Sequence, residues 1–238
     1  FLLYVELLRN LYFYIQEQYI RKNKAETSVQ IIHLFVEYSL ELLNGLDTLL
    51  LGNNNNSAIS VYRTFYETYI VFSFIQQHPD LIIPFANHVK MDECLLHFEL
   101  MKLRNEPISN EIQTQYDALI QQYGKDFEES YGWTASVIKE KNHRNLKNMF
   151  EQSMLGDTFA FYYKLSCKYT HATSFSLQAR PELKDIFGFL FAVIEIMYKE
   201  FDVLFSKVKV SSTKEKELMK QWIIVCSENL KKTIKEFF

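Results

Sequence analysis

The sequence predicts an all-α protein, a single domain spanning 1–238 whose long antiparallel helices form a bundle of roughly seven to nine helices. Three observations predict this class. Only 6 glycines and 4 prolines interrupt the 238 residues, so few positions force the chain to turn. Long stretches rich in Leu, Glu, Lys and Gln favour helix. Apolar residues recur at helical spacing, and no strand-like alternation, repeat or long linker is present.

Start and stop residues delimit the helices in order. The first covers 1–22 and ends in a polar run. The others are expected at 27–51, 57–78, 81–104, 107–129, 157–173, 182–207 and from 213 onward, with one short helix inside the less regular stretch 130–156 and a loop at 174–181. Expected N-caps are Thr27 or Ser28, Asp157 and Thr213. Breaks are expected at Gly52, Pro79 and Gly156.

Composition narrows the class of protein. Apolar residues make up 48% and charged residues 23% of the chain, which is typical of a globular protein. The net charge of −3 gives no global attraction to nucleic acid or to an anionic membrane. The 3 cysteines lie far apart, which argues against disulfides and zinc and favours the cytoplasm. Charges within 1–20 argue against a signal peptide or membrane span. Because the chain begins at Phe1 without Met, we expect a preceding leader or tag.

Two isolated charges stand out in the apolar helix expected from residue 57. Arg63 and Glu67 are the only charged residues between Asp47 and Asp80, and their i, i+4 spacing puts them on one face. An unpaired buried charge is costly, so the two should pair. The pair either organises helix packing, or Glu67 holds Arg63 toward a cleft where it binds phosphate or carboxylate.

Other candidate sites are weaker. The face with His33, Glu37 and Glu41, and the pair Glu93 and His97, have spacings that a metal tolerates, but an exposed polar face explains them better. A glycine-rich phosphate loop and a nucleophile elbow are absent from the sequence. Basic residues at 139–147 and 207–220 alternate with acidic ones and are expected on a solvated face.

The segment 161–174, FYYKLSCKYTHATS, ends the helix expected from Asp157. Lys164, Lys168 and His171 share one face of that helix. They are either a solvated basic face or a site in which His171 acts as general acid or base and the lysines attract phosphate.

Three motifs carry a family resemblance across about 57–180: Arg63-x-x-x-Glu67, Tyr131-Gly-Trp133 and Tyr163-x-Leu-Ser166-x-x-x-x-His171-x-x-Ser174. The chain resembles a bacterial family of all-helical proteins known only as a domain of unknown function. The resemblance implies a helical fold and a site at these residues, without a reaction. Aromatics of Tyr131-Gly-Trp133 are either core or able to stack a base.

More loosely, the chain is similar to HEPN-type helical domains, which cleave RNA without metal in toxin–antitoxin and phage-defence systems. Their signature is an Arg followed four to six residues later by His, on a helix at a dimer interface. Here the basic residue before His171 at that kind of spacing is Lys164, a departure from the signature. Arg63 can take the place of the signature Arg only if the helix that carries it packs against the helix that carries His171.

Three hypotheses follow. The first is a metal-independent ribonuclease or phosphoryl-transfer enzyme of a defence system, without cofactor or metal, acting on RNA or a nucleotide and forming a homodimer. The second is a helical module that binds a small anion, nucleotide or protein, and the third gives the motifs a purely structural role. For the enzyme, the expected catalytic residues are His171, Arg63 and Glu67, and the expected substrate-binding residues are Lys168, Ser166, Tyr163 and Tyr66.

Overall fold

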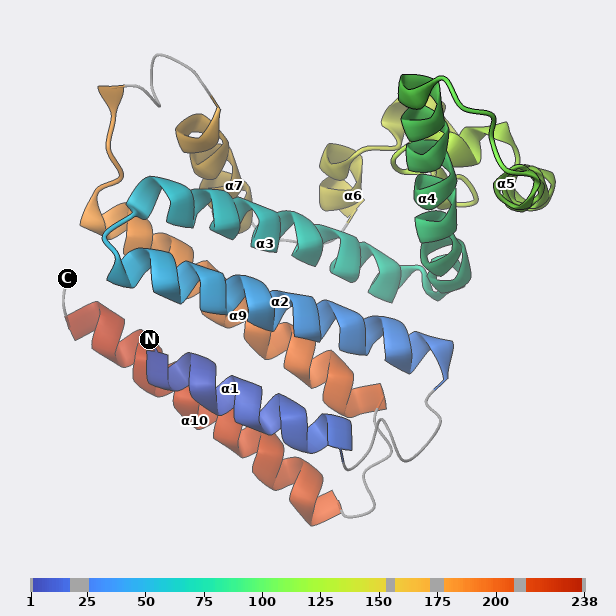
Figure 1. Ribbon diagram of the computed structural model, residues 1–238. Coiled ribbons are helices and arrows are strands. Elements are labelled where there is room, and N and C mark those ends of the chain that lie inside the picture. The colour runs from blue at the N-terminus through green and yellow to red at the C-terminus, as the bar shows by residue number, and fades with distance from the viewer. Residues whose placement is uncertain (1, 18–25, 153–156, 172–177, 208–212, 237–238) are drawn as a thin grey trace. The chain divides into compact units, whose positions relative to one another are not determined.

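The computed structural model describes residues 2–17, 26–152, 157–171, 178–207 and 213–236. These ranges contain helices and no strand (Figure 1). Their nine α-helices are α1 (Leu2–Ile15), α2 (Thr27–Leu51), α3 (Asn55–Gln77), α4 (Ile82–Arg104), α5 (Asn110–Tyr123), α6 (Leu146–Gln152), α7 (Asp157–Thr170), α9 (Leu183–Lys207) and α10 (Thr213–Glu236). Four short 3-10 helices accompany them in the same ranges: η2 (Pro79–Leu81), η3 (Lys125–Glu128), η4 (Gly132–Thr134) and η5 (Lys141–His143). The all-α prediction is confirmed.

The chain divides into two compact units, each with its own core. The first contains 1–72 and 155–238, and the second contains 73–154. A single domain spanning 1–238 stays a prediction. None of the helices in the described ranges carries an apolar stretch long enough to cross a bilayer.

Four antiparallel helices form the frame of the first unit. α1 packs against α2 and α10, and α9 packs against the same two helices, which closes a ring (Figure 1). Neighbours in this ring run in opposite directions. Apolar side chains at helical spacing, such as Leu43 on α2 and Val193 on α9, are fully buried inside it.

Two further helices lie against this ring and carry the motif residues. α3 contacts α2 through the rings of Phe72 and Phe35, 5.4 Å apart, and contacts α9 through Tyr62 and Phe189, 4.4 Å apart. α7 packs against α9. Stacked rings of Tyr66 and Tyr163, 5.2 Å apart, join α3 to α7.

Several predicted helix boundaries agree with the structure, and others are wrong for local reasons. α2 ends at Leu51 before Gly52, and α9 and α10 begin within one residue of the expected starts. The expected cap Thr27 is instead the first helical residue of α2, preceded by Glu26, whose side chain makes no capping bond. α3 begins two residues before Ser57. The predicted end of the first helix, Gly156 and the first half of the loop 174–181 lie outside the described residues.

The helix expected over 107–129 is shorter than predicted. α5 begins only at Asn110, because the Ser109 hydroxyl caps it by accepting from the backbone N–H of Ile112. It ends at Tyr123, because Gly124 takes a φ of +87° that breaks the helix. The chain then continues as η3.

The second unit is organised by α4 and the aromatic core beneath it. α4 packs against α5, η3 and η4. Trp133 of η4 is buried and contacts the edges or faces of Phe74 and Phe85, at centroid distances of 6.2 and 5.1 Å. Gly132 lies so close to η3 that a Cβ there would be 2.3 Å from the carbonyl oxygen of Asp126. Trp133 of Tyr131-Gly-Trp133 is therefore a core residue and does not stack on a base.

Candidate functional site

Arg63 and Glu67 form an ion pair at the edge of the core. The Nε of Arg63 donates to Oε1 of Glu67 at 2.9 Å, and the two side chains are 26% and 29% exposed. The flanking side chains of Tyr62 and Tyr66 on α3 are fully buried. The expected pairing is confirmed, and the pair is half-buried where full burial was expected.

The last turn of α7 meets this pair. NH1 of Arg63 donates to the Thr170 hydroxyl at 3.2 Å and lies 2.9 Å from Nε2 of His171. About two helix turns before them on α7, the Tyr163 hydroxyl donates to Oε1 of Glu67 at 3.1 Å. The structure thus brings Arg63, Glu67, Tyr163 and His171 together, although Arg63 and His171 are 108 residues apart in the sequence.

The contact between Arg63 and His171 fixes the tautomer of the imidazole. A guanidinium has only donors, so Nε2 of His171 must be the acceptor and carries no proton. The neutral ring then holds its proton on Nδ1. The pair of Arg63 and His171 therefore presents a cation beside an unprotonated nitrogen, which is the arrangement needed by a general base.

Arg63 is held in place through two of its three guanidinium nitrogens. Its Nε is used by Glu67, and the two N–H groups of NH1 are used by Thr170 and His171. Among the described residues, none accepts from NH2. Partial burial by itself lowers the pKa of Arg63, but the hydrogen bond and charge of Glu67 outweigh it and raise the pKa above its usual value. The guanidinium is therefore permanently cationic, and its NH2 group has donors that can pair with a phosphate oxygen.

Tyr163 and Tyr66 support the ion pair from the side of the core. Burial, followed by the negative charge of Glu67, raises the pKa of Tyr163 above its usual value, so its hydroxyl keeps the proton that it donates. Burial, with Tyr163 beside it, also raises the pKa of Tyr66. The ring of Tyr66 is fully buried and stacks on Tyr163, which places it behind the site.

Ser166 and Lys168 occupy different places on α7. Ser166 is fully buried, and its hydroxyl donates to the backbone carbonyl of Tyr163 at 2.7 Å. The hydroxyl proton of Ser166 is therefore used inside α7, and Ser166 does not bond to Arg63. Lys168 is exposed on the same helix, one turn before the His171 end. Ser174, the last residue of the motif, lies outside the described residues.

Two residues of this region escaped sequence reasoning. The Thr170 hydroxyl accepts a hydrogen bond from Arg63 and donates one to the backbone carbonyl of Ser166 at 3.0 Å. A hydroxyl at a helix end commonly bonds to its own backbone, so the sequence did not indicate the bond to Arg63. Gly188 on α9 lies under Tyr162, and a Cβ there would be 2.3 Å from the tyrosine oxygen. This close approach helps to seat α7 on α9. An isolated glycine inside an apolar helix was the available signal.

The basic residues of 139–147 lie on a solvated face as predicted, with Arg144 as the exception. The Arg144 side chain is only 6% exposed, and its guanidinium donates to Asp126 at 2.9 Å and to two backbone carbonyls, those of Ile138 and Lys139. Lys141 pairs with Glu129 at 2.7 Å. Arg144 therefore ties the loops of the second unit together from inside, whereas the pair of Lys141 and Glu129 lies at its surface.

The two helix faces whose spacing a metal would tolerate form no metal-like cluster among the described residues. Within the part of the chain that the structure describes, no three His, Cys, Asp or Glu side chains come together as a metal site requires. His33 lies 4.0 Å from Glu37 and bonds to the Tyr12 hydroxyl.

Residues 29–185 match a family of unknown function, DUF5677, over more than half of the chain. The chain belongs to this family. Comparisons with the curated proteins and with the solved structures give no match. In this DUF5677 protein the matched segment includes all of the residues around Arg63 and His171 and ends just after the start of α9.

Proposed function

We propose that the Arg63–His171 centre binds a phosphodiester of RNA and cleaves it by transesterification. The observation that supports this is the 2.9 Å contact between the Arg63 guanidinium and an unprotonated Nε2 of His171. A fixed cation and a neutral imidazole side by side are the two groups that this reaction needs. Glu67, Thr170 and Tyr163 hold the pair in place.

The reaction uses no group beyond the substrate and these side chains. Nε2 of His171 takes the proton of the ribose 2′-hydroxyl, which replaces the Arg63 N–H as its hydrogen-bond partner. The 2′ oxygen forms a bond to phosphorus as the bond from phosphorus to the 5′ oxygen breaks. The imidazolium of His171 returns the proton to the leaving 5′ oxygen. The products are a 2′,3′-cyclic phosphate and a 5′-hydroxyl, so atoms and charge balance.

Arg63 stabilises the charge that develops on the phosphate. Its NH2 edge has no acceptor among the described residues and can take a non-bridging oxygen. Glu67 prevents the guanidinium from rotating, so the ordering is complete before substrate binds. Lys168, exposed in the last turn of α7, adds attraction for the RNA backbone. A defence or toxin–antitoxin system and a homodimer belong to the same proposal.

A fluorogenic RNA oligonucleotide tests the reaction with the wild-type chain and with His171→Ala, Arg63→Met and His143→Ala. His143 is an exposed histidine, 54% accessible, outside the site, and serves as the matched control. We expect His171→Ala and Arg63→Met each to lower the cleavage rate by at least about 100-fold. His143→Ala should cleave at the wild-type rate. An unchanged rate in His171→Ala would contradict the proposal.

A second candidate function is binding of a nucleotide or phosphate without turnover. The NH2 group of Arg63 favours it independently of His171. A DNA oligonucleotide of the matching sequence lacks every 2′-hydroxyl and cannot undergo the reaction, but it keeps every phosphate. If the wild-type chain binds both this oligonucleotide and RNA, loses both with Arg63→Met, and never yields a cyclic phosphate, the binding module is correct and the enzyme is not.

A further inference from the structure

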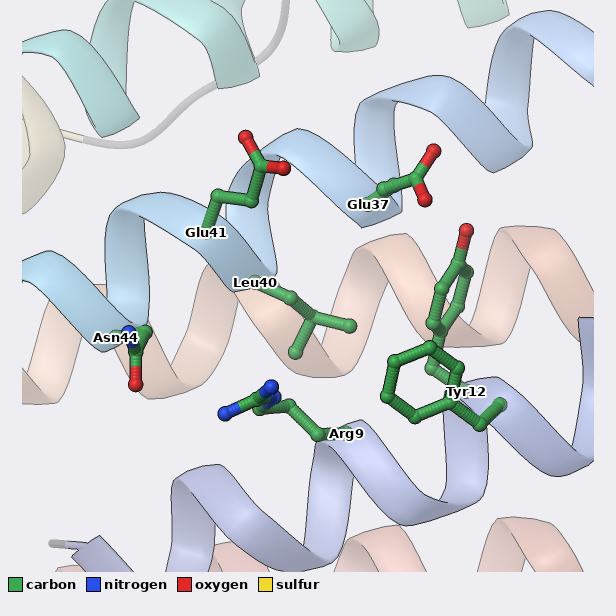
Figure 2. A pocket seen from close by; sticks show the side chains of 7 residues that line it. Arg9, Tyr12, Glu37, Leu40, Glu41 and Asn44 are labelled. Carbon is green, nitrogen blue, oxygen red and sulfur yellow. The ribbon is translucent and has the colours of Figure 1, made fainter.

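A pocket lies between α1 and α2, on residues that the Arg63–His171 site does not use (Figure 2). Its volume is about 160 Å³. The lining comes from one face of each helix at helical spacing: Arg9, Tyr12 and Phe13 from α1, and Glu37, Leu40, Glu41 and Asn44 from α2. Both helices belong to the first compact unit.

The floor of the pocket is apolar and fixed. Leu40 and Tyr12 are only 5% and 2% exposed, and the Tyr12 hydroxyl is held by His33. Phe13, at 49% exposed, forms a wall that meets solvent. This combination of a buried floor and an accessible aromatic wall suits a small apolar group.

The rim carries charges of both signs. Figure 2 shows Arg9 extending from α1 beneath Leu40, and Glu37 and Glu41 on α2 with the Glu41 carboxylate directed away from Arg9. Within the described residues, neither Arg9 nor Glu41 has an ion-pair partner inside 4.0 Å. Glu37 has only a long contact of 4.0 Å to His33. Arg9 and the two glutamates therefore line one pocket without forming an ion pair with each other.

We infer that this pocket binds a small zwitterion with an apolar side chain, the class of a free α-amino acid. Its carboxylate pairs with Arg9, to which a guanidinium can donate two parallel bonds, and the Asn44 amide stands beside it. Its ammonium lies between Glu37 and Glu41, and its side chain rests on Leu40.

Charge and size both restrict the ligand. A purely cationic ligand satisfies the two glutamates but is repelled by Arg9, and a purely anionic ligand meets the opposite conflict. The volume is close to that of a cavity of about 150 Å³ that holds benzene and lies well below the roughly 300 to 1,000 Å³ of drug-sized pockets. A ligand with a few carbon atoms and both charges fits these limits.

The test uses L-leucine and two analogues that each lack one charge, 3-methylbutylamine and 4-methylpentanoate. Calorimetric titration of the full chain should give saturable binding of L-leucine and at least about tenfold weaker binding of each analogue. Arg9→Met and Glu41→Gln should each weaken L-leucine binding by at least about tenfold. The matched control is Glu6→Gln, an exposed carboxylate on α1 outside the lining, which should bind as the wild type does.

Any one of three other outcomes overturns the inference. An analogue that binds as well as L-leucine shows that only one charge is recognised. Unchanged binding in Arg9→Met places the ligand elsewhere, and absence of saturation at millimolar L-leucine shows that the pocket does not take this class. Circular dichroism of each variant verifies that it is folded. Because the pocket shares no residue with the Arg63–His171 site, neither result depends on RNA cleavage.

Discussion

Replacing Glu200 by glutamine should remove most of the loss of folding stability that the protein shows as the pH rises toward 8. Glu200 lies on α9 and is completely buried. Its Oε1 accepts a hydrogen bond from the Ser39 hydroxyl of α2 at 3.0 Å, while Oε2 has no hydrogen-bond partner among the described residues. Burial raises the pKa of Glu200 to about 8, with the Ser39 bond acting in the opposite direction.

The sign and size follow from the two protonation states. In the unfolded chain the carboxyl has its ordinary pKa of 4.5 and releases its proton above that value. The folded protein keeps the proton until about pH 8. Between these values the folded state binds more protons, so the free energy of unfolding falls as pH rises. At about 1.4 kcal/mol per pKa unit, the loss is on the order of 5 kcal/mol.

Urea denaturation at a series of pH values from about 5 to 9 measures this dependence. Glu200→Gln keeps an oxygen for Ser39 and cannot ionise, so its free energy of unfolding should be nearly flat over the range and should exceed that of the wild type at pH 8. Glu6→Gln, which changes an exposed carboxylate, is the control and should retain the wild-type slope. Parallel pH profiles for the wild type and Glu200→Gln would refute the reasoning.

Three further substitutions test the packing. Gly132→Ala places a Cβ 2.3 Å from the Asp126 carbonyl and 2.6 Å from Cα of Phe127, so thermal denaturation should show a loss of about 3 kcal/mol; a loss below about 1 kcal/mol would mean that the backbone yields. Tyr62→Phe removes a buried hydroxyl without a hydrogen-bond partner and should raise the free energy of unfolding in urea by about 1 kcal/mol, whereas a decrease would reveal a partner for it. Arg144→Met leaves the Asp126 carboxylate and two carbonyls without their donor, so hydrogen exchange around 125–146 should accelerate by at least about tenfold, and unchanged protection would contradict its anchoring role.

Local chemistry made most of the helices predictable. Scarce glycine and proline, helical spacing of apolar residues and stops such as Gly52 and Pro79 act within a few residues of one another. The failures lie where a side chain decided the boundary. Ser109 and Gly124 shorten α5 through one capping bond and one positive φ, features that periodicity does not record.

The sequence predicted the two parts of the candidate site separately, but not that they meet. Arg63 and Glu67 had to pair because they are isolated charges one helix turn apart, and the pair exists at 2.9 Å. The place of Thr170 could not be inferred, because a hydroxyl at the end of α7 matters only once α3 lies beside it. Arg144 was misjudged for the same reason, since its partners include Asp126, 18 residues away.

By itself, the sequence determined the all-helical class, the extent of most helices and the pairing of Arg63 with Glu67, because these depend on interactions within a few helical turns. Only the tertiary structure decided that His171 lies 2.9 Å from Arg63. That distance depends on the seating of α7 against α9, where Tyr162 fits over Gly188, and on the stacking of Tyr66 with Tyr163. Such contacts join residues about a hundred positions apart, and helical periodicity sets which face a residue occupies without setting which helix that face meets.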